Sequence, residues 1–187
     1  MSDAELPGWQ LPSFRSDRLL FRPFALSDAE AAFEIFGDAE VMRYSVSGHD
    51  RNLAVTAARV ERYARQNATS GFAPWAIVET AFEALVGLCG LMRLKDGNDV
   101  EIAYRLRRDC WGKGIATEAA RAWLDCAFSQ LRLPRIVAFV DPANTASVGV
   151  VVKIGMRFVE DCRYEGMPVG KYEITNPNTT TLPIRDR

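Results

Sequence analysis

The sequence contains few of the residues from which metal centres and disulfide frameworks are built. It has four cysteines and one histidine in 187 residues. The cysteines lack the paired spacing of a zinc site and the density of a disulfide scaffold, so we expect free thiols in a reducing, cytoplasmic compartment and no metal. They are Cys89, Cys110, Cys126 and Cys162. His49 falls in a predicted loop and is interpreted as a surface residue.

Long apolar runs and an excess of one charge are also missing. No segment approaches the roughly 20 apolar residues of a membrane span, and the charged N-terminal segment lacks the apolar core of a signal peptide. The 23 basic and 24 acidic residues give a net charge of −1, which offers no general attraction for nucleic acid or membrane. We expect one domain over residues 1–187, with its core at about 16–175, and the sequence leaves a homodimer open.

Hydrophobic periodicity predicts seven strands and four helices. The strands are expected at 18–24, 72–79, 84–94, 100–106, 135–140, 156–164 and 169–175, and the helices at 27–36, 52–68, 116–128 and 145–154. Residues 96–98 predict a turn, and the polar tail from Asn176 predicts loose packing. The helix at 116–128 connects two apolar strands, which predicts a parallel pair with a right-handed crossover. The fold class is therefore α/β, with a mixed sheet of about seven strands flanked by about four helices.

Two of the predicted helices carry specific expectations. Ser27 and Glu30 have the spacing of a capping box at the start of the first helix. In the second helix, the inward positions are expected to be Val55, Ala58, Val60, Tyr63 and Ala64.

The glycine-rich stretch after the strand at 100–106 predicts an anion site. Gly112 and Gly114 flank Lys113, and a helix-forming run follows at once. Such a turn brings free backbone N–H groups to the positive end of a helix dipole. Two glycines alone would favour a plain tight turn before a helix.

Three separated segments in a fixed order resemble the GNAT superfamily of acetyl-CoA-dependent N-acetyltransferases, and in particular its ribosomal-protein N-terminal (Rim-type) branch. They are residues 16–23 (SDRLLFRP), 100–106 with 111–119 (VEIAYRL and WGKGIATEA), and 144–147 with 153–158 (NTAS and KIGMRF). Two departures stand out. Asp109 occupies the first position of the family's glycine turn, and Val151 replaces the tyrosine that many relatives use as an acid.

The resemblance implies how acetyl-CoA would be held. The pyrophosphate would lie against the turn formed by Trp111, Gly112, Lys113, Gly114, Ile115, Ala116 and Thr117. Further coenzyme contacts would come from Ile102, Tyr104, Leu106 and Asn144, with a backbone N–H near Tyr104 meeting the oxyanion. Asn144 also reads as a good helix N-cap, which is a purely structural role.

Glu101 and Ser147 are the candidate catalytic residues. Alternation places Glu101 with Ala103 and Arg105 on one strand face, and a carboxylate in a central strand costs free energy unless it is paired or faces a cleft. Glu101 is the candidate base, and an ion pair with Arg105 or another cation is the structural alternative. The resemblance implies that the Ser147 hydroxyl lies near the sulfur and donates to the thiolate.

The sequence thus predicts transfer of an acetyl group from acetyl-CoA to a primary amine, on a protein N-terminus or a small molecule, by direct attack. The irregular stretch 38–51 is expected to influence acceptor choice, but it does not name the acceptor. An acetyl-cysteine route through Cys110 lacks a visible histidine partner. The alternative function is a non-catalytic acyl-CoA-binding or sensing module. A nucleotide enzyme fits less well, because the turn lacks the third glycine of a dinucleotide site and the spacing of a P-loop.

Overall fold

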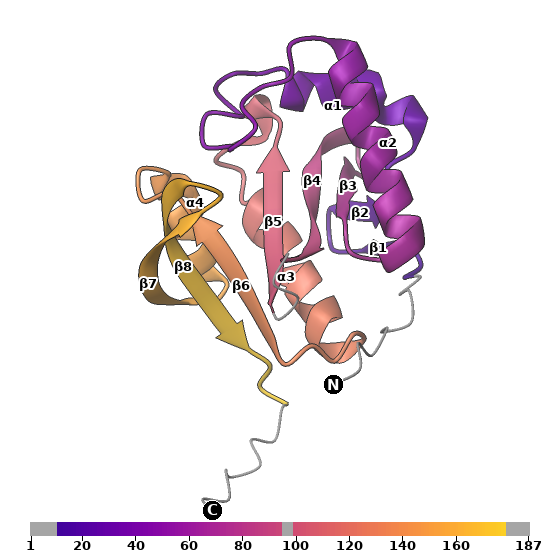
Figure 1. Ribbon diagram of the computed structural model, residues 1–187. Helices are drawn as coiled ribbons and strands as arrows, with labels where there is room; N and C mark the ends of the chain where they lie inside the picture. Colours follow the sequence, from indigo (N-terminus) through magenta and orange to yellow (C-terminus); the bar gives the residue numbers. More distant parts are fainter. Residues whose placement is uncertain (1–10, 95–98, 179–187) are drawn as a thin grey trace, which may run out of the picture.

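The computed structural model describes residues 11–94 and 99–178 (Figure 1). Within them the strands are β1 (Phe14–Arg15), β2 (Leu19–Arg22), β3 (Pro74–Glu79), β4 (Ala84–Arg93), β5 (Val100–Leu106), β6 (Arg135–Val140), β7 (Arg157–Tyr164) and β8 (Met167–Thr175). The α-helices are α1 (Ala29–Phe36), α2 (Leu53–Ser70), α3 (Ile115–Ser129) and α4 (Thr145–Lys153). Two 3₁₀ helices, η1 (Leu26–Asp28) and η2 (Arg108–Cys110), precede α1 and the glycine turn.

The strands form one eight-stranded mixed sheet in the order β1-β2-β3-β4-β5-β6-β8-β7. Every neighbouring pair is antiparallel except β5 and β6, which are parallel and are connected through α3. The predicted parallel pair is therefore confirmed, and so is the mixed α/β class. The eighth strand is the two-residue β1, which is too short to leave a periodic signal in the sequence.

Apolar side chains form a core on each face of the sheet. One core packs the sheet against α3 and α4 and includes Trp123, Ile115 and Val151. The other packs it against α1 and α2 and includes Phe36 and Val60. In Figure 1, α2 lies in front of the sheet and α3 passes behind it.

Three local predictions are wrong. No Ser27 capping box forms, because the segment starts as η1 and the Asp28 carboxylate accepts the Ala25 N–H instead, at 2.7 Å from N to Oδ2. In α2, Val55 and Ala58 are exposed. Asn176 is buried rather than loosely packed, because its Nδ2 donates to the Leu133 carbonyl oxygen at 3.1 Å.

The turn predicted at 96–98 lies outside the described residues, and so does the tail from residue 179. Across 11–94 and 99–178, no helix combines the length and hydrophobicity that a membrane span requires.

Candidate active site

The parallel strands β5 and β6 pair at one end and then separate. Their register contains a single residue pair, Glu101 with Val137. In Figure 1 the two strands diverge toward their carboxyl ends. Arg107 N–H donates to the Val86 carbonyl of β4, and backbone groups alternate between the two edges of a strand, so those of Ile102, Tyr104 and Leu106 point toward β6. No residue of β6 pairs with Tyr104 or Leu106, which leaves this edge of β5 open.

The glycine turn lies beyond the carboxyl end of β5 and leads into α3. Gly112 and Gly114 have φ values of +74° and +78°, a region that L side chains adopt only with strain. Within the described residues, no backbone N–H from Gly112 to Thr117 donates to a protein group, and the first intrahelical bond runs from Glu118 N–H to the Gly114 carbonyl. Six consecutive free N–H groups at the start of a 15-residue helix supply the donors and the dipole that an anion-binding site requires.

The start of α3 is tied to the N-terminal segment by Glu118. Its carboxylate accepts the Ser16 hydroxyl at 2.7 Å, the Arg18 backbone N–H at 2.9 Å and the Arg18 Nε at 2.7 Å. Arg18 Nη1 also donates to the Lys113 carbonyl oxygen at 3.2 Å. Two of the sequence segments recognised separately therefore contact each other, and the contact holds the glycine turn in place.

The polar side chains around the turn have separate partners. Asp109 is held by Arg107, whose Nε and Nη2 donate to its carboxylate at 2.7 and 2.9 Å, and this pairing lowers the pKa of Asp109. Trp111 is 45% exposed, and its Nε1 donates to the Leu106 carbonyl oxygen at 3.1 Å. Lys113 is exposed beside the free N–H groups. The unusual Asp109 is thus neutralised locally.

Glu101 lies buried in β5 at the closed end of the gap. Its side chain is reached by Tyr164 of β7, whose hydroxyl donates to Oε2 at 2.9 Å. Burial raises the pKa of Glu101 from 4.5 to about 7, with a further raising effect from Glu165, while the Tyr164 hydrogen bond and the charge of Arg105 act in the lowering direction. Arg105 does not form the ion pair that the structural alternative required, so Glu101 titrates near neutral pH.

Tyr104 and Ser147 connect β5 to α4 across the open side. Their hydroxyl oxygens are 2.8 Å apart, and the Tyr104 hydroxyl is 3.1 Å from the Ser147 carbonyl oxygen. Burial raises the pKa of Tyr104 above its ordinary value, so the phenol keeps its proton. The Asn144 side chain caps α4 by accepting the Ser147 N–H at 3.1 Å, as the structural interpretation expected.

The remaining predicted positions are placed as follows. The side chains of Ile102, Leu106 and Ile115 are buried in the core against α3, so only their backbones face the gap or the turn. Ala116 and Thr117 are partly exposed at the start of α3. Val151 is fully buried and cannot serve as an acid.

Residues 18–157 match the acetyltransferase (GNAT) domain family. The chain belongs to the GNAT family. Among curated proteins, this GNAT chain is 31% identical over 161 residues to the uncharacterized protein YkkB of Bacillus subtilis, a match that covers 84% of this chain and 92% of YkkB. It is 25% identical to spermidine N(1)-acetyltransferase of Escherichia coli, covering 87% of this chain and 84% of that enzyme.

A solved structure of a GNAT-family acetyltransferase from Bacillus anthracis superposes with a TM-score of 0.74 at 29% identity, covering 88% of this chain and 99% of that one. Several further relatives are named as N-acetyltransferases, among them p20 of Bacillus licheniformis, which is 29% identical. The protein is an N-acetyltransferase with the GNAT fold.

Sequence reasoning missed one side chain and one contact in this GNAT site. Tyr164 comes from the last hairpin, 63 positions from Glu101, and nothing local in the sequence signals that contact. Tyr104 was predicted as a coenzyme contact, and the pairing of its hydroxyl with Ser147 was not predicted. A signal for Tyr104 did exist, since alternation puts it on the face opposite Glu101.

Proposed function

We propose that this N-acetyltransferase uses acetyl-CoA as its acetyl donor and transfers the group directly to a primary amine. The observation that carries the proposal is the run of six free N–H groups from Gly112 to Thr117, next to a β5 edge that has no strand partner. The diphosphate of coenzyme A would bind the turn, and its pantetheine arm would extend beside Tyr104 and Leu106 into the gap. Asn144, at the start of α4, would border the same arm.

Glu101 is the proposed general base. The amine nitrogen attacks the thioester carbonyl carbon, and its proton passes to Glu101, directly or through one water. With a pKa of about 7, Glu101 lies closer to the pKa of an ammonium group than an ordinary glutamate does. It is therefore a stronger base for removing the proton of the amine. The N–H near Tyr104 would donate to the carbonyl oxygen as it becomes negatively charged.

The hydroxyl pair of Tyr104 and Ser147 is proposed to act on the leaving group. When the C–S bond breaks, sulfur carries the negative charge, and one of these hydroxyls donates a hydrogen bond or proton to it. The two are already hydrogen-bonded, so the hydroxyl that does not face the sulfur can polarise the one that does. This arrangement would take over the role of the tyrosine replaced by Val151.

Direct transfer is favoured over an acetyl-cysteine route. Cys110 is the cysteine next to the turn, and it is buried. Burial, followed by the neighbouring Asp109, raises the pKa of its thiol, which disfavours the thiolate needed for attack.

For the acceptor we propose a protein N-terminus or a small-molecule amine, and we place the chain in the Rim-type branch. The contact of Ser16 and Arg18 with Glu118 supports this placement, because it joins two segments on which the resemblance rests. A polyamine, the acceptor named for the Escherichia coli relative, is the second small-molecule class to test.

The deciding experiment measures thiol release from acetyl-CoA over a panel of peptide, amino-acid and polyamine acceptors. Lys113→Glu should raise the KM for acetyl-CoA about 10-fold with little change in kcat, because it puts a negative charge beside the diphosphate. Lys153→Glu, which changes an exposed lysine at the end of α4, is the matched control.

Tight binding of acetyl-CoA without thiol release from any acceptor would favour the non-catalytic module. A protein that does not bind acetyl-CoA at all would refute the proposal.

A further inference from the structure

Arg105 lies on the same face of β5 as Glu101. In the pairing of β4 with β5, Arg105 is opposite Leu88 and Glu101 is opposite Met92. Directly opposite residues share a sheet face, and Leu88 belongs to the core beneath α1 and α2. Glu101 and Arg105 therefore face the α1 and α2 layer, while Tyr104 faces α3 and α4.

The Arg105 guanidinium has no carboxylate partner. Within residues 11–94 and 99–178 it forms no hydrogen bond and no ion pair, although the residue is only partly exposed. The nearby Asp50 is already occupied, because it accepts Arg59 Nη2 at 2.5 Å, Arg59 Nε at 3.1 Å and the Thr56 hydroxyl at 2.8 Å. A guanidinium carries five donors and keeps its charge in proteins, so Arg105 has unused donors that an anion could engage.

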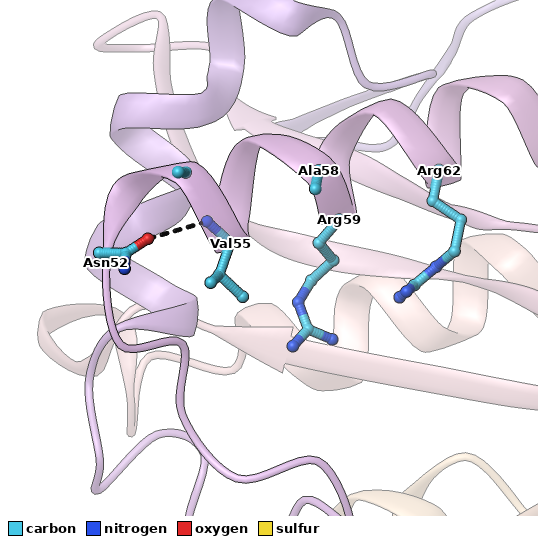
Figure 2. Close-up of a pocket in the computed structure, with 6 residues that line it drawn as sticks. Asn52, Val55, Ala58, Arg59 and Arg62 are labelled. Atoms are coloured by element: carbon cyan, nitrogen blue, oxygen red, sulfur yellow. Dashed lines mark hydrogen bonds between the residues drawn. The ribbon is translucent and has the colours of Figure 1, made fainter.

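Arg59 adds a second positive charge beside Arg105. It projects from the same side of α2 as Arg62, as Figure 2 shows, and both line an open hollow with Asn52, Ala54, Val55 and Ala58. Burial lowers the pKa of Arg105 and Arg59 lowers it further, while Tyr63, Asp50 and Glu101 act in the opposite direction. Of the two carboxylates that act on Arg105, Asp50 is paired with Arg59, and Glu101, whose pKa burial raises to about 7, is uncharged for part of the neutral pH range.

We infer that Arg105, with Arg59 beside it, forms a subsite for a carboxylate or phosphate group carried by the amine acceptor. This inference rests on the proposed transfer reaction, since it assumes that the acceptor amine approaches Glu101. An anion on Arg105 would form the charge-assisted hydrogen bonds that the protein leaves unmade.

The spacing on β5 limits the shape of such an acceptor. Four residues along a strand span about 13 Å between the Cα atoms of Glu101 and Arg105, and both side chains are long enough to shorten this gap. The acceptor would therefore carry its amine and its anionic group several bonds apart. A diamine would place a second positive charge against Arg105 and should be a poor acceptor.

The test compares ω-aminocarboxylates, ω-aminoalkyl phosphates and diamines in matched series of chain length. For wild-type protein we expect kcat/KM of the best anionic acceptor to exceed that of the diamine of equal length by about 10- to 100-fold. Arg105→Gln should remove most of this preference, because it should lower kcat/KM for the anionic acceptor far more than for a monoamine without an anionic group, and Arg105→Lys should restore part of it. The carboxylate and phosphate arms identify which anion is preferred.

Arg65→Gln is the matched control, because Arg65 lies on α2 with an exposed side chain and pairs with Glu61 at 3.6 Å. Thermal unfolding of each variant checks folding, and Arg105→Gln should be at least as stable as wild type because it removes an unpaired, partly buried charge.

Calorimetric binding of the anionic compounds to the protein with coenzyme A separates this inference from the proposed function. Arg105-dependent binding without turnover would support the subsite and refute the transfer reaction. Turnover with equal preference for anionic acceptors and diamines would refute the subsite alone, and so would an equal loss of kcat/KM for every acceptor in Arg105→Gln.

Discussion

Glu101 is the residue at which the proposed function lowers the stability of the fold. Its carboxyl is 6% exposed and touches one hydrogen-bond donor, the Tyr164 hydroxyl. Burial raises its pKa to about 7, so ionising it in the folded protein costs free energy that an exposed glutamate would not. A residue with only a structural role gains nothing from this unfavourable ionisation. The cost therefore supports a functional role for Glu101 as the base.

Replacing Glu101 with glutamine should lower activity and raise stability. We expect Glu101→Gln to reduce kcat/KM by roughly 10²- to 10⁴-fold, and wild-type kcat/KM to rise with pH through about 7. Because the folded pKa lies above 4.5, wild type loses stability between pH 4.5 and about 7, and the variant does not. Denaturant unfolding should show the variant more stable by up to about 3 kcal/mol at pH 8 and equal to wild type near pH 4.

Glu160→Gln, a change at an exposed position of β7, is the control and should alter neither quantity. A Glu101→Gln enzyme with wild-type kcat/KM at every pH would remove Glu101 from catalysis.

The hydroxyls of Tyr104 and Ser147 should behave as one unit. If either can donate to the leaving thiolate, Tyr104→Phe and Ser147→Ala should each lower kcat by about 10-fold, and the double variant should cost clearly less than the product. A thioester with a more acidic thiol leaving group should reduce the loss in all three variants. Fully multiplicative effects would show that the two hydroxyls act independently.

At the scale of elements, the glycine turn depends on a contact made by the short segment between β1 and β2. Ser16 and Arg18 lie in that segment, and they hold Glu118 in the first turn of α3. The sequence placed these motifs about 100 positions apart without indicating that they touch. Local patterns define an element, whereas a contact between elements depends on the topology of the sheet.

Arg18→Ala should therefore make the glycine turn less rigid, although Arg18 lies outside that turn. Glu118 would lose its two contacts with the Arg18 guanidinium, at Nε and Nη2, and because the Arg18 side chain is 46% exposed, we expect a loss of only about 1 kcal/mol in unfolding free energy. The KM for acetyl-CoA should rise severalfold at unchanged kcat, measured by thiol release at varied acetyl-CoA. Arg15→Ala, in the same segment and exposed, is the control; equal effects of the two substitutions would contradict the assigned contact.

The same distinction explains which helix predictions succeeded. The existence of α2 and its Asn52 cap followed from the sequence, and Asn52 Oδ1 accepts the Val55 N–H at 3.1 Å. The sequence predicted too many inward-facing residues for this helix. Only Thr56 and Val60 are fully buried, so α2 packs through a narrow stripe and leaves Val55 next to the hollow with Arg59 and Arg62. Apolar periodicity cannot distinguish core from the rim of an open hollow.

At the scale of the whole molecule, the sheet has two parts that meet at one end. The strands β1 to β5 and the strands β6 to β8 are joined by the single β5–β6 pair at Glu101 and Val137. The sequence predicted that these two strands are parallel neighbours, from the crossover helix between them. The sequence could not predict the point at which the two strands separate. The loss of hydrogen bonding between two strands leaves no pattern in the sequence of either strand.

Asp99 reinforces this junction and carries the last prediction. It lies directly before β5, is 8% exposed, and binds Arg135 of β6 and Lys171 of β8, the latter at 3.2 Å from Nζ to Oδ2. Burial acts to raise the pKa of Asp99, but the two cations outweigh it and lower the pKa below 3.8. Its stabilising effect is therefore present above about pH 4 and is lost as the pH falls through the folded pKa.

Asp99→Asn should destabilise the protein at pH 7 by about 1–3 kcal/mol, because two cations lose a shared partner. The difference from wild type should shrink as the pH falls through the lowered folded pKa, where the wild-type carboxyl becomes protonated as well. Denaturant unfolding across this range measures it, with the exposed Asp161→Asn of β7 as the control. Because the junction sets how β5 and β6 separate, the variant should also bind acetyl-CoA more weakly at pH 7. If the variant is less stable but binds acetyl-CoA as tightly as wild type, the gap between β5 and β6 keeps its shape without the ion pairs of Asp99.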